Sequence, residues 1–183
     1  MKLVVAATGA SGAIYTQRLL DNLTGHQIHY IATGHAREVQ ELELPGGVKL
    51  PTGVIRYEEK GSMFVPFVSG SAKFDAMIVI PASMGTVGRI ATGVSDGTIA
   101  RAADVFLKER RKLILVPREA PYNLIHLRNM ATLTEAGATI IPASPSFYSQ
   151  LQTITGLVDT IIARVLDHLG IEHQLTKRWQ SAD

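Results

Sequence analysis

Short apolar runs alternate with segments of helical period along most of the chain, and this alternation restricts the fold more than any other feature. Strands that are apolar on both sides are typical of a parallel sheet with both faces covered by helices. We therefore predict a single α/β domain with a doubly wound, flavodoxin-like or Rossmann-like parallel sheet. The expected strands are KLVVAAT, IHYIAT, AMIVIPAS, KLILVP and ATIIPAS.

The segments between these runs carry apolar residues at helical spacing. Two further stretches, 45–52 and 61–73, contain Gly, Pro or Ser and are expected to be loops. The domain is expected to span residues 1–183, with a C-terminal tail from about residue 172. The predicted helices cover 11–23, 38–44, 98–110, 123–136 and 154–169.

Composition excludes several functional classes. With 46% hydrophobic and 19% charged residues over 183 positions, the chain is suited to one well-packed core and not to disorder. The net charge of +2 does not indicate nucleic-acid binding, and the absence of Cys removes thiolate metal ligands and a cysteine nucleophile. No apolar stretch reaches the ~18 residues that cross a bilayer, and the first apolar run is too short for a signal peptide, so we expect a cytoplasmic protein.

The ligand site is expected at the carboxyl edge of the sheet, where open α/β sheets bind ligands. The glycines of TGASGAIY permit a tight turn between the first strand and first helix, and Ser11 adds a hydroxyl at the start of that helix. Tyr15 occupies the third-glycine position of a dinucleotide motif, and the second strand ends in Thr33 where a ribose-binding acid would be needed. FMN therefore fits better than NAD, while Arg37 leaves NADP as an alternative.

Two groups of charged residues have both a structural and a functional interpretation. Arg101 and Lys108 share a helix face with Asp104, which fits a surface stripe of ion pairs or a ligand site. Arg118 and Glu119 lie between two prolines just after a strand, in a solvated loop or at the site. Neither group decides between these interpretations by itself.

Six segments, in order over nearly the whole chain, closely resemble the UbiX-type flavin prenyltransferases. They are TGASGAIY, IPASMGTVGRIATG, RAADVFLKERR, LVPREAP, HLRNM and PSFY. The resemblance implies a homo-oligomer, a dodecamer, with sites between subunits. It also implies transfer of the dimethylallyl group of dimethylallyl monophosphate to N5 and then C6 of reduced FMN, without a metal. The product would serve a UbiD-type decarboxylase.

The same resemblance implies roles for individual residues. Met63 stands in the prenyl-side loop, where some relatives carry a Trp. FMN would be held by Gly9, Ala10, Ser11, Gly12, Thr33, Ser83, Thr86 and Arg101. The catalytic residues would be Glu119, Lys108, Arg118 and Glu43. The prenyl phosphate site would be formed by Tyr148, Arg164, Arg118, Lys108 and Trp179.

Physical chemistry supports this set, because two Arg, a Lys and a Tyr hydroxyl can neutralise a leaving phosphate dianion. Two alternatives remain. One is an FMN-dependent decarboxylase of the phosphopantothenoylcysteine type, although its catalytic His and PxMNxxMW-like segment are not found. The other is a non-catalytic NADP-binding sensor, which would leave the Arg118 and Glu119 pair unexplained.

Overall fold

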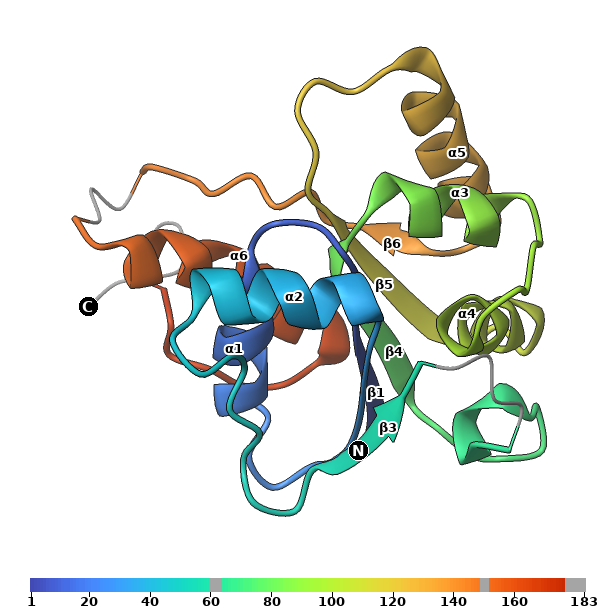
Figure 1. Ribbon diagram of the computed structural model, residues 1–183, viewed down its shortest axis with the longest axis horizontal. Helices are drawn as coiled ribbons and strands as arrows, with labels where there is room; N and C mark the ends of the chain where they lie inside the picture. Colours follow the sequence, from blue (N-terminus) through green and yellow to red (C-terminus); the bar gives the residue numbers. More distant parts are fainter. Residues whose placement is uncertain (60–63, 149–151, 177–183) are drawn as a thin grey trace.

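The computed structural model describes residues 1–59, 64–148 and 152–176. Within them, six parallel strands form one sheet in the order β3-β2-β1-β4-β5-β6, which is the strand order of the Rossmann fold (Figure 1). This confirms the predicted doubly wound α/β fold. The strands are β1 (Lys2–Ala7), β2 (Gln27–Ala32), β3 (Ile55–Glu58), β4 (Ala76–Ala82), β5 (Lys112–Pro117) and β6 (Thr139–Ile140).

Helices cover both faces of the sheet. The helix predicted over 154–169 has those bounds, and each of the other four predicted segments overlaps an observed helix. The helices are α1 (Ala13–Asp21), α2 (Gly34–Glu43), α3 (Met84–Ala91), α4 (Thr98–Lys108), α5 (Leu124–Glu135) and α6 (Ile154–Leu169), with a short 3-10 turn, η1 (Pro66–Val68). None of the helices in these ranges is long and apolar enough to cross a membrane.

Two elements were not predicted from the sequence, and each has a physical reason. Strand β3 lies at the sheet edge and reads IRYE, so it lacks the continuous apolar character of the buried strands. Helix α3 contains two glycines, which lower helix propensity. At Gly88 the space is used for packing, since a Cβ there would lie 3.3 Å from Asn129 Nδ2 of α5.

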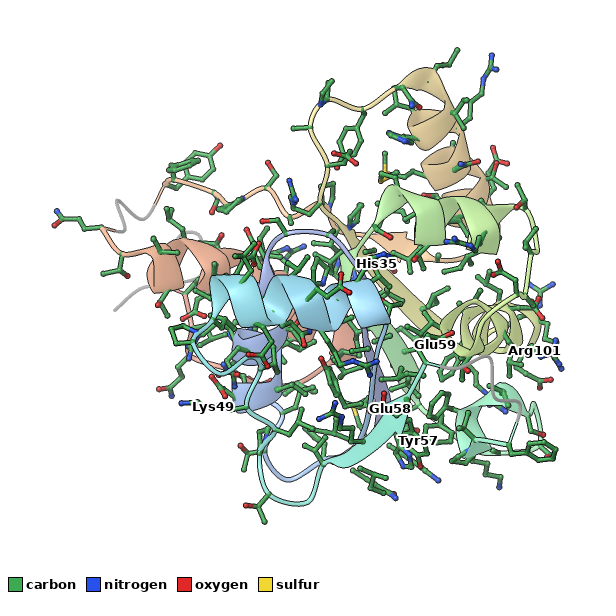
Figure 2. All side chains as sticks on the ribbon, viewed as in Figure 1. His35, Lys49, Tyr57, Glu58, Glu59 and Arg101 are labelled. Carbon is green, nitrogen blue, oxygen red and sulfur yellow. The ribbon has the colours of Figure 1, made fainter. Side chains whose placement is uncertain are left out.

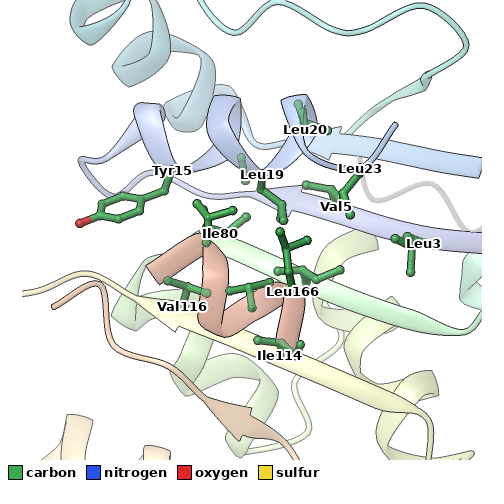
Figure 3. Packing of buried hydrophobic residues seen from close by; sticks show 14 of the residues in the cluster. Leu3, Val5, Tyr15, Leu19, Leu20, Leu23, Ile80, Ile114, Val116 and Leu166 are labelled. Atoms are coloured by element: carbon green, nitrogen blue, oxygen red, sulfur yellow. The ribbon is translucent and has the colours of Figure 1, made fainter. Parts of the chain in front are cut away.

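Strand β1 shows why the central strands are apolar on both sides. Leu3 and Val5 face a core cluster formed with α1 and α6, whereas Val4 faces a second cluster formed with α3, α4 and α5. Figure 3 shows the first cluster, in which Leu19 of α1 and Leu166 of α6 meet the strands. All five side chains are fully buried, so neither face of β1 tolerates a polar residue.

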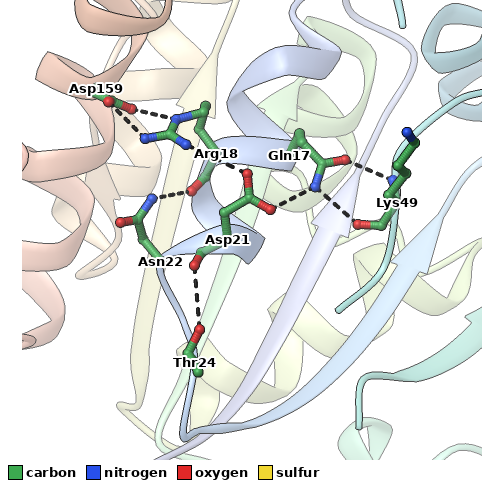
Figure 4. A network of polar contacts seen from close by, with 7 residues as sticks. All are labelled: Gln17, Arg18, Asp21, Asn22, Thr24, Lys49 and Asp159. Atoms are coloured by element: carbon green, nitrogen blue, oxygen red, sulfur yellow. Dashed lines mark hydrogen bonds and ion pairs between the residues drawn. The ribbon is translucent and has the colours of Figure 1, made fainter. Parts of the chain in front are cut away.

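An ion pair joins the two helices of the first face. Arg18 of α1 donates from Nε and Nη2 to the two carboxylate oxygens of Asp159 on α6, each at 2.8 Å (Figure 4). The side chain of Asp159 is only 11% exposed, and that of Arg18 is 25% exposed. Two parallel charge-assisted bonds of this kind fix the relative position of the helices.

We expect Arg18→Met to destabilise the protein by about 1–3 kcal/mol, because it leaves the buried Asp159 carboxylate unpaired. Urea denaturation followed by circular dichroism measures the change. Arg56→Ala is the matched control: it removes a surface ion pair to Glu58 of 3.4 Å and should change stability by less than about 0.5 kcal/mol. Equal losses in the two variants would contradict a structural role for the Arg18 pair.

Candidate functional site

The carboxyl ends of β1, β2 and β4 surround a cavity of about 390 Å³. Its walls include four of the residues expected to hold FMN: Gly9, Thr33, Ser83 and Thr86. Thr8 ties two of these loops together, since its hydroxyl donates to Pro81 O at 2.9 Å and accepts from Ser83 N at 2.7 Å. The other lining residues are His35, Glu59, Gly85, Arg89, Asp96, Gly97, Ile99 and Ala100.

Three helices begin at this cavity, and their positive ends make it suited to an anion. Two begin with their own hydroxyl cap: Thr33 Oγ1 accepts from Ala36 N at 3.0 Å on α2, and Ser83 Oγ accepts from Thr86 N at 3.4 Å on α3. The third, α4, begins after Gly97, which has no side chain to cap it.

Close backbone approach shapes the entrance to the cavity. A Cβ at Gly9 would lie 2.7 Å from the Cβ of His35, a distance that real Cβ atoms do not show. Glycine at this position therefore lets the first loop lie against the start of α2. Figure 2 places His35 at this start and Glu59 farther along the same edge, beside α4.

A second cluster forms at the start of α1. Glu43, the last residue of α2, accepts from Gly12 N at 2.8 Å and from Ala13 N at 2.7 Å. Arg118 Nε donates to Ser11 O at 3.1 Å in the same cluster. The structure thus brings together Ser11, Gly12, Glu43 and Arg118, which the sequence placed in two different roles.

The carboxyl of Glu43 has a shifted pKa. Burial, the largest influence, raises it, but the Ser11 hydroxyl, the amides of Gly12 and Ala13 and the charge of Arg118 together hold the pKa below its ordinary value. The anion at the start of α1 is therefore this carboxylate. The starts of α2 and α3 face the cavity instead.

Glu119 lies at the carboxyl end of β5, next to this cluster in sequence. It is exposed, and its Oε1 accepts from Ala120 N at 3.1 Å. Its charge contributes, after burial, to raising the pKa of Tyr122. The position agrees with the expected edge of the sheet, while the chemistry of Glu119 stays a prediction.

The remaining expected ligands lie outside the cavity of one protomer. Arg101 binds Asp104 at 2.8 Å, Lys108 binds Glu109 at 2.5 Å, and Arg164 of α6 binds Asp167 at 3.0 Å. Lys108 is at the opposite end of α4 from the cavity, about 15 Å along the helix. Tyr148 follows β6 and is 83% exposed. Trp179 and Met63 lie outside the described residues.

Sequence reasoning missed His35, Glu59, Arg89 and Asp96. His35 had a usable signal, because it comes three residues after Ala32, the last residue of β2, and so lies at the same edge. Glu59 could have been found only with β3, which was not predicted. Arg89 and Asp96 bind each other at 3.2 Å near the end of α3. They were missed because the glycines of α3 lower its helix propensity, so this helix was not predicted.

Comparison with known proteins identifies close relatives. The Flavoprotein family matches residues 1–166. The flavin prenyltransferase UbiX of Methanocaldococcus jannaschii is 43% identical over 98% of both chains. The structure of AnUbiX (PadA1) in complex with FMN and dimethylallyl pyrophosphate is similar with a TM-score of 0.91 and 36% identity, over 100% of this chain and 98% of that one. The structure of a dodecameric FMN-dependent UbiX-like decarboxylase of Escherichia coli O157:H7 is 40% identical in sequence and has a TM-score of 0.91. The match covers 99% of this chain and 100% of that one.

We expect Glu43→Gln to lower the free energy of unfolding by about 1 kcal/mol at neutral pH, the usual worth of a helix cap. Because the folded pKa of Glu43 is lowered, its carboxylate stabilises the fold fully above the ordinary value of 4.5 and loses this effect as the pH falls through the folded value. Urea denaturation at about pH 7 and about pH 3 should therefore show a larger difference between variant and wild type at the higher pH. Glu38→Gln, an exposed carboxyl on the same helix, is the control. An equal loss at both pH values would contradict the cap.

Proposed function

The chain belongs to the UbiX family of flavin prenyltransferases, and from this premise we propose that it joins a dimethylallyl group from dimethylallyl monophosphate to N5 and C6 of reduced FMN. The observation that carries the proposal is the cavity at the carboxyl edge, where the starts of α2 and α3 face one pocket. Its hydroxyls and amides fit the phosphate and ribityl chain of FMN.

The residues around the cavity fit FMN in both shape and charge. Thr33, Ser83 and Thr86 would hold the phosphate, with the amides that begin α2 and α3. The loop of Gly9, Ala10, Ser11 and Gly12 would lie along the flavin, because Gly9 permits close backbone approach. Reduced FMN would supply the two nucleophilic ring atoms. The family relationship and the cavity also favour this ligand over the NADP of the sensor alternative.

The cluster at the start of α1 would handle the prenyl phosphate. In the transfer, N5 of reduced FMN would bond to the allylic carbon and lose its proton, while the bond from that carbon to the phosphate oxygen would break and phosphate would leave with both bonding electrons. The alkene would then take up a proton, and C6 would bond to its tertiary carbon and lose its own proton. Arg118 and Lys108, with Arg164 and Tyr148, would neutralise the leaving dianion. Glu119 would give a proton or hydrogen bond to the leaving oxygen, and Glu43 would keep the first loop in place.

Completing this site requires several copies of the chain. In one protomer Lys108 and Arg164 bind carboxylates of their own helices, away from the cavity. Large apolar side chains are also exposed on α5, on the segment after β6 and at the start of α6: Leu124, Ile125, Leu127, Phe147 and Ile154. We propose a homo-oligomer, a dodecamer as in the E. coli relative, in which a neighbouring chain brings Arg101, Lys108, Tyr148, Arg164 and Trp179 to the flavin.

Three finer points belong to the same proposal. The donor is the monophosphate, which needs fewer countercharges than a diphosphate, and no metal takes part. The recipient of the prenylated flavin is a UbiD-type decarboxylase. The protein acts in the cytoplasm.

Mass spectrometry tests the reaction directly. Flavin extracted after incubating the reduced holoenzyme with dimethylallyl monophosphate should carry the mass of one added prenyl group. The same incubation without reduction is the control, because oxidised FMN lacks the nucleophile. Unmodified flavin from the reduced sample would refute the proposed reaction, and loss of carbon dioxide from an added carboxylic acid would favour the decarboxylase alternative.

We expect Glu119→Gln to retain FMN but to slow prenyl transfer by roughly 10²–10⁴-fold, the range typical of a general acid–base group. Single-turnover flavin absorbance measures the rate, and the flavin content of the purified variant measures FMN binding. Glu135→Gln, at the end of α5, is the matched control and should keep the wild-type rate. A wild-type rate in Glu119→Gln would return this residue to the solvated-loop interpretation.

A further inference from the structure

The start of α4 differs from the two other helix starts at the cavity. Because Gly97 offers no cap, a carboxylate from another element takes that place: Glu59 accepts from Thr98 N at 2.7 Å and from Ile99 N at 3.0 Å. Both oxygens are thus used, one on each amide. The positive end of α4 is neutralised from within the chain, whereas the ends of α2 and α3 carry only neutral hydroxyl caps.

The backbone at Gly97 makes this contact possible. A Cβ at that position would lie 2.5 Å from Glu59 Oε1, so any other residue would push the carboxylate away from the helix. Glu59 follows directly after β3, and Tyr57 in that strand is bound to buried His29 of β2 at 2.9 Å between Oη and Nδ1. The edge strand therefore has a fixed position, and Glu59 reaches the cavity from it.

In the described part of the chain, no salt bridge joins Glu59 to a cationic side chain, and its carboxylate is held by the first two amides of α4. Among the lining residues in the described part of the chain, Arg89 is paired with Asp96 at 3.2 Å, so their charges cancel. His35 contributes no full charge in its neutral form. Burial is the largest of the influences that raise the pKa of Glu59, followed in the same direction by the charge of Asp96, while the two amides lower it. In its ionised form, the carboxylate of Glu59 opposes a nearby phosphate.

We infer that Glu59 is a specificity-determining residue that weakens the hold of the cavity on the phosphate of the flavin. The inference rests on the proposed function, in which FMN enters as a substrate and must leave as a prenylated product. Three unopposed helix ends would bind the phosphate too tightly for exchange. With one end occupied by Glu59, two ends hold the phosphate, and the flavin is released after each turnover.

A comparison of FMN binding with riboflavin binding isolates the contribution of the phosphate to affinity. FMN and riboflavin differ only in the phosphate, so their affinities for the oligomer, measured by quenching of flavin fluorescence, report on this group alone. We expect Glu59→Gln, which keeps the shape but loses the charge, to bind FMN about tenfold more tightly and to release it correspondingly more slowly. Its affinity for riboflavin should change less than about twofold.

Two further variants complete the design. Glu59→Ala removes the charge and also exposes the amides of α4, so FMN should bind more tightly still, again with riboflavin unchanged. Glu58→Gln is the matched control, because Glu58 pairs with Arg37 and Arg56 and does not line the cavity. It should bind both flavins as the wild type does. Circular dichroism and the melting temperature establish that each variant is folded.

The possible outcomes are distinct. If both folded Glu59 variants bind FMN no more tightly than the wild type, the inference is wrong. Weaker binding of both flavins would overturn it too, since Glu59 would then hold the flavin instead of opposing its phosphate. A wild-type protein that binds neither flavin would instead refute the proposed function. If Glu59→Gln does not fold, Glu59→Ala with the same pair of flavins still decides the question.

Discussion

The parallel direction of all six strands is the constraint on which the rest of the structure depends. Because every strand runs the same way, the helices that follow β1, β2 and β4 all begin at one edge of the sheet. Their unsatisfied amides and their dipoles concentrate positive potential there. At this edge, the carboxylates of Glu43 and Glu59 accept hydrogen bonds from the first amides of α1 and α4. The starts of α2 and α3 carry no such carboxylate and are available to a ligand.

The sequence predicted those parts of the fold that burial determines. Strands such as β1 and β4 are apolar on both sides because helices cover both faces, and the long amphipathic α6 was predicted with its observed ends. The prediction of elements failed where the local amino-acid composition does not indicate how a segment is packed in the fold. Strand β3 has few buried side chains, and the glycines of α3 serve its packing against α5 while lowering its helix propensity.

The site residues also fall into those that the sequence predicted and those that it did not. Residues that follow a strand directly, such as Thr33, Ser83 and Arg118, were predicted at the right edge because chain direction places them there. Glu59 depended on a tertiary contact 39 positions away and gave no local signal. Lys108 and Arg164 raise a different problem. Their proposed role involves neighbouring chains, and neither the order of residues nor the structure of one protomer describes such contacts.

The bare backbone of Gly97 has a consequence for how this protein can vary over evolution. Because a Cβ at 97 would lie 2.5 Å from Glu59 Oε1, a larger residue at 97 requires the far end of the Glu59 side chain to shift. That shift would move the carboxylate away from the first amides of α4. A Ser, Thr, Asp or Asn at 97 could cap α4 itself, in the usual position for such a cap. Positions 59 and 97 are therefore coupled through the cap of α4.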